Sequence, residues 1–366
     1  MKTTEKIKLN WALLTAILLP AGLCALFSLL KRDTQRMDLW VFGVMGPLEQ
    51  ALGRFWSLFP FSVAEVLTAL ALAGSVLWLV RALVLLLHCG QRRCFLRRMA
   101  ALAAVWLWVL AGFNWLWNTS YYASTFSQRS GLTIQTYSVE ELRDVTRYFA
   151  HNAARLSDQI ARDKNGHSQA ALPDCFKRAP QVYQNLTSEF PRLSMTSVEA
   201  KPLLCSRLQS ILGFTGIYFP FTGEANVNVD APACLIPATI AHEMAHQRMI
   251  ASELEANFVG IAACTTSDDT VFQYSGYLMG LIQLCNALYS VDPHGWYDIA
   301  EEYFTPELFT DWNDNNAYWA SFDSTLEEVA ERTYDQFLKS NDQELGMRSY
   351  GACVDLLVAY YGPLAR

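Results

Sequence analysis

Three long apolar runs in the first third of the chain constrain its fold more than any other feature. They cover residues 10–30, 58–80 and 99–117, and each is long enough to cross a bilayer, which takes about 20 apolar residues. Glu65 interrupts the second run. The first run has no clear small-x-small cleavage site and further apolar runs follow it, so we interpret it as a retained anchor. The sequence therefore predicts a membrane domain with three transmembrane helices over residues 1–118.

Basic residues predict the orientation of these spans, because Lys and Arg concentrate in cytoplasmic segments. The N-terminal tail and the segment between the second and third runs carry most of them: Lys2, Lys6, Lys8, Arg81, Arg92, Arg93, Arg97 and Arg98. The loop between the first and second runs also carries basic residues, although acidic residues in the same loop offset their charge. We therefore expect a multi-pass protein of the cell membrane, with the N-terminus in the cytoplasm and residues 119–366 outside it.

The part after the third run is strongly acidic. Residues 119–366 contain 16 Lys and Arg against 30 Asp and Glu, a net charge near −14. Such a domain would repel a polyanion. We therefore predict a lipid bilayer as a partner, through the three spans, and no nucleic acid.

The outer part is predicted to be mainly α with a small β-sheet, an α+β fold. Residues 213–232 are rich in Gly, Thr, aromatic and β-branched residues, which is typical of one or two strands in a hairpin. Helical patterns precede and follow them. Residues 271–291 carry no charge and could form a fourth span, but their polar side chains and acidic flanks favour a buried core helix.

The stretch HEMAHQRMIASELEAN, residues 242–257, carries the chemistry. His242 and His246 are four residues apart, so they share one face of a helix and could reach one tetrahedral metal ion. Glu243 lies beside the first histidine and could reach a water at that position without binding the metal. This is the spacing that zinc-dependent hydrolysis requires. The sequence predicts Zn²⁺ bound by the two histidines, with Glu243 as general base.

A catalytic zinc needs a third protein ligand. Metzincins place a histidine six residues after the second one, and here that position is Ser252. Glu253 and Glu255 are the remaining candidates. The Ser-x-x-Glu pattern at 252–255 predicts a capping box, in which Glu255 turns back to the backbone of Ser252 and leaves Glu253 free. We therefore predict Glu253 as the ligand, Glu255 as the alternative, and Asn257 as a residue that orients the ligand.

Five segments carry a family likeness: GFTGIYFPFTGEANVN, AHEMAHQRMIASELEANFVGIAAC, SDDTVFQYSGYL, NTSYYASTFSQRSGL and SYGACVDLLVAYY. They resemble a bacterial family of multispanning membrane proteins, domain-of-unknown-function family 3810, which is predicted to be zinc-peptidase-like. More distantly, ELEAN at 253–257 is similar to the Glu-x-x-Ala-Asp segment of membrane peptidases that include the CAAX prenyl proteases and HtpX. There the first Glu is the third zinc ligand, and Asn257 here replaces the Asp.

The resemblance implies a gluzincin-type catalytic core over residues 119–366. In such folds the strand before the active helix binds extended peptide by strand addition, which places a peptide or protein substrate along Ala225 to Val229. An internal hairpin with both edges covered is the alternative. Hydrolysis also needs a donor for the oxyanion. Tyr350, in one of the family-like segments, is the leading candidate, with His294 and Arg348 behind it.

Together these features predict a membrane-anchored zinc metallopeptidase, taken as an endopeptidase, that acts outside the cytoplasmic membrane. The alternative is a catalytically silent membrane scaffold that keeps zinc for folding. Glu243 disfavours it, because a structural zinc site has no use for a general base. A transporter subunit is suggested only by the spans. The sequence leaves the substrate open.

Overall fold

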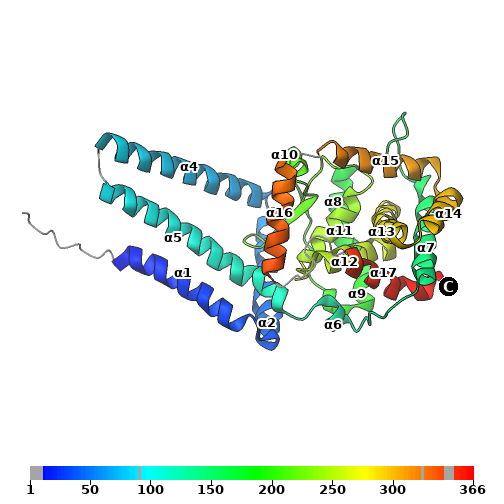
Figure 1. Ribbon diagram of the computed structural model, residues 1–366, viewed down its shortest axis with the longest axis horizontal. Helices are drawn as coiled ribbons and strands as arrows, with labels where there is room; N and C mark the ends of the chain where they lie inside the picture. The colour runs from blue at the N-terminus through cyan, green and yellow to red at the C-terminus, as the bar shows by residue number, and fades with distance from the viewer. Residues whose placement is uncertain (1–10, 90–91, 323–324, 342–349) are drawn as a thin grey trace, which may run out of the picture.

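Three apolar helices project from one side of a globular body (Figure 1). The computed structural model describes residues 11–89, 92–322, 325–341 and 350–366. The projecting helices are α1 (Trp11–Leu30), α4 (Val63–Cys89) and α5 (Arg92–Leu116). By length and composition, the helical stretches Trp11–Leu30, Val63–His88 and Arg92–Tyr122 could each cross a membrane. Three candidate spans are thus confirmed.

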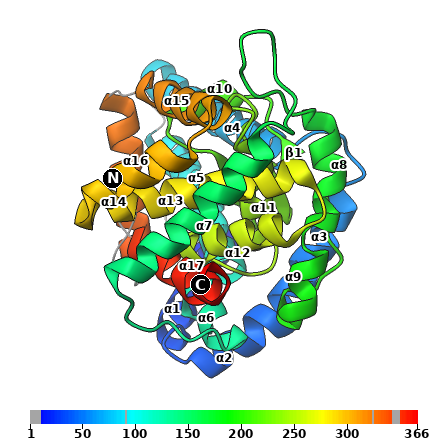
Figure 2. The ribbon, with the colours of Figure 1, turned by 90° about the vertical axis from the view of Figure 1, so that its right-hand side faces the viewer.

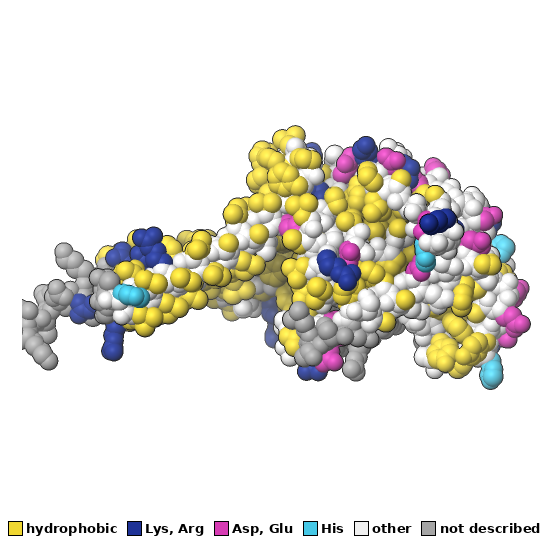
Figure 3. All heavy atoms as spheres, turned by 90° about the horizontal axis from the view of Figure 1, so that it is seen from above, with side chains coloured by type: hydrophobic (Ala, Val, Ile, Leu, Met, Phe, Trp, Pro, Cys, Tyr) yellow, Lys and Arg dark blue, Asp and Glu magenta, His cyan; other side chains and the backbone are white. Residues whose placement is uncertain are grey.

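The boundaries of the second and third spans differ from the prediction. Helix α4 begins at Val63 rather than near residue 58, because Pro60 disfavours a helix before it and Ser62 accepts a hydrogen bond from the Glu65 backbone. The basic residues expected in the following loop lie on helices instead: Arg81 on α4, and Arg92, Arg93, Arg97 and Arg98 on the first turns of α5. Lys and Arg side chains gather at the tip of the projecting helices, away from the body (Figure 3).

The segment between the first and second spans packs against the globular body. It comprises α2 (Thr34–Trp40), a short π-helix η1 (Val41–Met45) and α3 (Gly46–Trp56). Met37, Val41 and Met45 are fully buried in a cluster with Tyr218 and Met249 of the outer part. This segment therefore completes the core next to the candidate site.

The body itself is built from helices around one large core. Its helices are η2 (Asn118–Tyr122), α6 (Phe126–Ser130), α7 (Val139–Ser157), α8 (Leu172–Val182), α9 (Gln184–Glu189), η3 (Pro191–Leu193), α10 (Ser206–Ile211), α11 (Ile236–His246), α12 (Glu253–Thr266), α13 (Thr270–Val291), α14 (Pro293–Tyr303), α15 (Pro306–Ala320), α16 (Thr325–Ser340) and α17 (Tyr350–Ala365). In Figure 2, α7 crosses in front of α11, α12 and α13. The prediction for residues 271–291 is confirmed: α13 is a core helix, with Phe272, Leu281 and Leu288 fully buried.

A small sheet borders α11. It has three strands, β1 (Lys201–Pro202), β2 (Gly216–Phe219) and β3 (Glu224–Val227), in the order β1-β3-β2. Strands β2 and β3 form the expected hairpin, with Gly216 opposite Val227 and Phe219 opposite Glu224, while β1 runs parallel to β3. Gly223 turns the hairpin with a φ of +66°, a conformation that favours glycine.

Candidate metal centre

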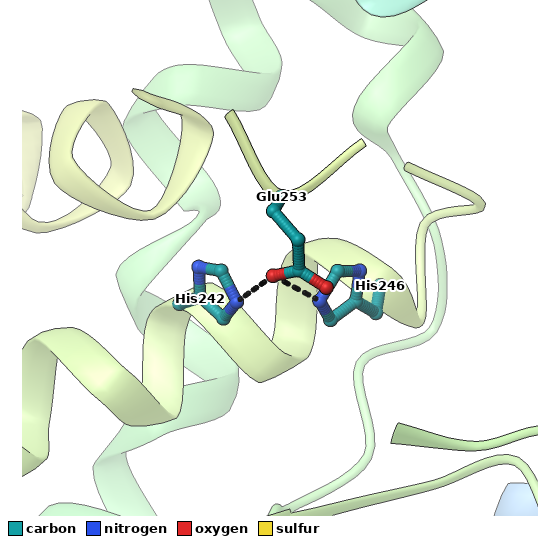
Figure 4. Close-up of side chains that lie close together, drawn as sticks. All are labelled: His242, His246 and Glu253. Atoms are coloured by element: carbon teal, nitrogen blue, oxygen red, sulfur yellow. Dashed lines mark ion pairs between the residues drawn. The ribbon is translucent and has the colours of Figure 1, made fainter. Parts of the chain in front are cut away.

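The structure brings His242, His246 and Glu253 together (Figure 4). Both histidines lie on the last turns of α11, and Glu253 begins α12. Oε2 of Glu253 is 3.2 Å from Nε2 of His242 and 3.7 Å from Nε2 of His246. One ligand atom from each residue lies within 4.8 Å of the others. The three ligands predicted from the motif therefore converge on one point.

The arrangement suits a tetrahedral metal ion. With metal–ligand bonds of about 2.0–2.1 Å, the ligand atoms of a tetrahedral site lie roughly 3.4 Å apart. The ring of His246 is oriented through Nδ1, which lies 2.6 Å from the carbonyl oxygen of Ile250, so its Nε2 faces Glu253. Such hydrogen bonds to the far nitrogen are typical of metal-binding histidines. The residues present could hold a metal ion.

The turn between α11 and α12 places Glu253 over the histidines. Its sharpest point is Met249, with a left-handed φ of 60°. For a residue other than glycine this conformation costs about 1–2 kcal/mol. The Met249 side chain is buried in the cluster with Met45 and Val41, which offsets that cost. The segment between the first two spans thus supports the turn that places Glu253, the third candidate ligand.

Glu243 is buried beside the two histidines. Its Oε2 has no hydrogen-bond partner among the described residues. Burial raises the pKa of Glu243 to about 7, although the nearby histidines oppose the rise. On its other side lies Gly216 of β2, where even a methyl group would overlap the Glu243 carboxylate. The close fit of this strand holds the carboxylate in place.

Charge couples Glu253 to His246 in the metal-free protein. Burial opposes a charge on His246, but the Glu253 carboxylate outweighs it and raises the pKa of His246 to about 9. Burial also opposes a charge on Glu253, but the interactions with the two histidines outweigh burial and hold the pKa of Glu253 well below its usual range. A metal ion at this point would replace the proton on His246 as the partner of the carboxylate.

The predicted role of Glu255 needs a correction. The Ser252 side chain makes no capping hydrogen bond at the start of α12. The Glu255 carboxylate instead accepts hydrogen bonds from the backbone N–H groups of Phe126 (2.7 Å) and Ser127 (2.9 Å), at the N-terminus of α6. A carboxylate is favourable there because the first N–H groups of a helix lack internal partners. Glu255 is thus a structural residue, and the capping box is absent.

Other predicted site residues lie at or outside the centre. Asn257 lines the same cavity but makes no hydrogen bond to the three candidate ligands. His294 is exposed at the start of α14 and does not line the cavity. Tyr350 begins α17, but its side chain lies outside the described residues, as does Arg348. The oxyanion role of Tyr350 stays a prediction.

The candidate centre lies in a cavity of about 570 Å³. Aromatic side chains that the sequence analysis did not single out line it: Phe113, Trp117, Tyr121, Phe214, Tyr218, Tyr334 and Phe337. Of these, Tyr334 donates a 2.5 Å hydrogen bond to Oε1 of Glu253. A larger cavity of about 730 Å³ lies between α8 and the loop before α4, but no histidine or cysteine lines it among the described residues. We therefore place the chemistry in the smaller cavity.

Strand addition at Ala225 to Val229 is wrong in this structure. Strand β3 is the central strand and pairs with β1 on one side and β2 on the other, so it has no free edge. The edge strands are β1 and β2, and β2 also lines the cavity. The carbonyl of Thr215 accepts a hydrogen bond from the N–H of Asn228. Since an antiparallel ladder alternates, the backbone groups of Gly216 and Tyr218 point away from β3.

Comparison with known proteins gives one match. A family model described as "Protein of unknown function (DUF3810)" matches residues 43–358, from the first interspan segment to the last helix. No curated protein and no solved structure matches the chain. The expected likeness to gluzincins, CAAX prenyl proteases and HtpX has no support from these comparisons.

Proposed function

We propose that this chain, which belongs to the DUF3810 family, is a membrane-anchored zinc metallopeptidase that hydrolyses internal peptide bonds. One observation carries the proposal. Nε2 of His242, Nε2 of His246 and Oε2 of Glu253 converge in a cavity, beside the buried carboxylate of Glu243, whose Oε2 has no hydrogen-bond partner among the described residues.

The donor set supports zinc. Two histidines and one glutamate are the protein ligands of several catalytic zinc sites, which keep a further position open. Zinc bound there would lower the pKa of a water molecule and polarise the carbonyl of the scissile bond. Glu253 would stay in place because Tyr334 holds its other oxygen.

Glu243 would move the proton. Its carboxylate would orient the attacking water, take a proton from it and pass that proton to the nitrogen of the leaving amine. The water oxygen forms the new bond to the carbonyl carbon, the C–N bond breaks, and a carboxylic acid and an amine result. A pKa near neutrality, as burial gives Glu243, suits a group that accepts and then returns a proton.

Strand β2 offers a place for the substrate. An extended peptide would pair with the backbone groups of Gly216 and Tyr218, which carries its scissile bond past Glu243. Among the described residues that line the cavity, none is Lys or Arg, so no cation is present to hold a C-terminal carboxylate. This favours internal bonds over release of single C-terminal residues.

A catalytically silent zinc scaffold is the competing function. It gives no reason for Glu243, since a buried carboxylate oxygen without a hydrogen-bond partner, such as its Oε2 among the described residues, destabilises the fold. A general base explains why such a residue is tolerated. The acidic outer part and the basic tip of the spans support placing the centre outside the cytoplasm.

The test measures metal content and hydrolysis on the purified full-length protein. We expect about one zinc per chain by mass spectrometry, lost in Glu253→Ala and retained in Glu255→Gln, which keeps an acceptor at the N-terminus of α6. We expect Glu243→Gln to retain zinc and to lose hydrolysis of a peptide library. A wild-type protein that takes up no zinc would overturn the proposal. Zinc binding without hydrolysis of any peptide would support the silent scaffold.

A further inference from the structure

We infer that the substrates are polypeptides anchored in the same bilayer, cut within a few residues of the point where they leave it. This inference rests on the proposed hydrolase and names its substrate class. It follows from the position of the candidate centre relative to the ends of the spans.

The level of the membrane surface can be read from α1 and its partner. Helix α1 has 20 residues, which at 1.5 Å each span about 30 Å, the thickness of the hydrocarbon layer. Leu30 therefore marks the edge of that layer. Nζ of the next residue, Lys31, donates a 2.7 Å hydrogen bond to the hydroxyl of Tyr122. Tyr122, which ends the third candidate span, thus lies at the same edge.

The candidate centre lies at this level. Trp117 precedes Tyr122 by little more than one helical turn, on the side of the span. The ring centroids of Trp117 and His246 are 5.5 Å apart. The metal ligands are therefore at the membrane surface rather than above it.

The cavity wall continues into a span. Phe113 of α5 lies one turn deeper than Trp117 and lines the same cavity, where its ring meets Phe337 of α16 at 5.8 Å. A polypeptide that leaves the bilayer beside α5 would meet these aromatic side chains first. An apolar junction between a span and its extramembrane segment matches such a wall.

The body cannot swing away from the membrane without losing buried contacts. The Glu224 carboxylate on β3 accepts hydrogen bonds from the N–H groups of Val63 (3.2 Å) and Ala64 (2.7 Å), the first residues of α4. Lys201 on β1 donates to Glu224 at 2.5 Å and to the carbonyls of Trp56 and Phe61. The sheet that carries β2 is therefore fixed to the start of a span.

The end of α3 and the loop before α4 hold the body close to the lipid as well. Residues 55–61 read FWSLFPF, and Phe55 and Leu58 are 54% and 76% exposed. Apolar and aromatic side chains next to a span settle at the membrane surface. The substrate strand β2 is thus held at a fixed level beside the membrane surface.

The level of the candidate centre relative to the membrane surface determines which peptide bond of the substrate is cleaved. The centre lies next to Trp117, which is one to two helical turns from Tyr122 along the chain, and this corresponds to about 5–10 Å. An extended chain advances about 3.3 Å per residue. The scissile bond should therefore lie within about three residues of the end of the substrate's span.

The experiment uses full-length, zinc-loaded protein in vesicles of phosphatidylethanolamine and phosphatidylglycerol. The probe is a random octapeptide library joined to one leucine-alanine span through Gly-Ser spacers of two different lengths, roughly one residue and roughly twenty. A third arm is the same library without a span. Cleavage is measured by mass spectrometry, with Glu243→Gln as the inactive control.

We expect the short-spacer library to be cut at least about tenfold faster than the long-spacer library, although both have the same concentration in the membrane. We expect the same difference in rate between the short-spacer library and the soluble library. Equal rates for both spacers, or a soluble library cut as fast as the short-spacer one, would overturn the inference and leave the hydrolase standing. No cleavage in any arm by zinc-loaded protein would overturn the proposed hydrolase, and the inference with it.

Discussion

Tyr334 donates a hydrogen bond to Oε1 of Glu253, and Oε2 of the same carboxylate faces His242 and His246. Helix α16 thereby fixes which oxygen of the candidate ligand meets the histidines. The two residues come from helices far apart in the chain, so this contact ties the C-terminal part of the protein to the centre.

Replacing Tyr334 by Phe should weaken zinc binding by about 10- to 100-fold, because hydrogen bonds to a ligand set its orientation. Zinc affinity measured by competition with a chelator checks this. Tyr289→Phe is the matched control, since it removes the same hydroxyl from a half-exposed side chain that does not line the cavity. Equal affinities in the two variants would contradict the positioning role.

Gly216→Ala should separate metal binding from hydrolysis. A methyl group at this position overlaps the Glu243 carboxylate, so the proposed base must move, while the three ligands keep their contacts. We expect peptide hydrolysis to fall about 100-fold or more, the usual contribution of a general base, with zinc content unchanged. Gly74→Ala on α4, where a methyl group meets no atom within 4 Å, is the control. Full activity in Gly216→Ala would remove Glu243 from the mechanism.

Glu49 should make the stability of the protein depend on pH. It is buried against Tyr218, and burial raises the pKa of its carboxyl well above the ordinary value, although the hydrogen bond from Tyr218 opposes the rise. A carboxyl whose pKa is raised by folding stabilises the protein fully below its unfolded pKa of about 4.3, and this contribution is lost as pH rises through the folded value.

Relative to Glu49→Gln, the thermal stability of the wild type should therefore fall as pH rises from about 5 to about 8. Thermal unfolding in detergent, followed by tryptophan fluorescence, measures this. The exposed Glu199, changed to Gln, provides the control. If the difference in thermal stability between the wild type and Glu49→Gln stayed constant across this pH range, the prediction would be contradicted.

Met45→Ala should destabilise the body by about 2–5 kcal/mol, because it leaves a cavity among fully buried side chains. Leu48→Ala, one helical turn away and 45% exposed, should cost much less. The unfolding midpoints of the two variants measure this difference in stability. The comparison tests whether the segment between the first two spans belongs to the core, since a segment that merely connects spans would tolerate both changes equally.

Local sequence patterns were enough to predict the features that depend only on the length of a segment or on the spacing of its residues. Apolar length predicted three spans, and the four-residue spacing of His242 and His246 predicted their shared helix face. Glu253, the predicted third ligand, does lie beside the two histidines, but part of the argument for it was wrong. The capping box that was to occupy Glu255 is absent, and Glu255 binds the start of α6 instead.

Contacts between distant parts of the chain could not be predicted. Tyr334 and Glu253 are 81 residues apart, and Phe126 and Glu255 are 129 apart, so no periodicity links them. The composition of residues 213–232 predicted the hairpin correctly, but not that β3 would lie between two other strands. Strand β1, only two residues long, covers one edge of β3, and so short a strand leaves no pattern in the sequence.

The bonds of Glu224 to the start of α4 also affect how the protein matures. In a chain whose second span failed to insert, or inserted in the opposite direction, Glu224 would lack the amides of Val63 and Ala64. Leaving a buried charged group without these hydrogen bonds costs about 1–3 kcal/mol or more, and the sheet beside the centre would be destabilised. Insertion of the second span is thus coupled to the folding of the sheet during biogenesis, and a misinserted copy would be less stable at the candidate centre.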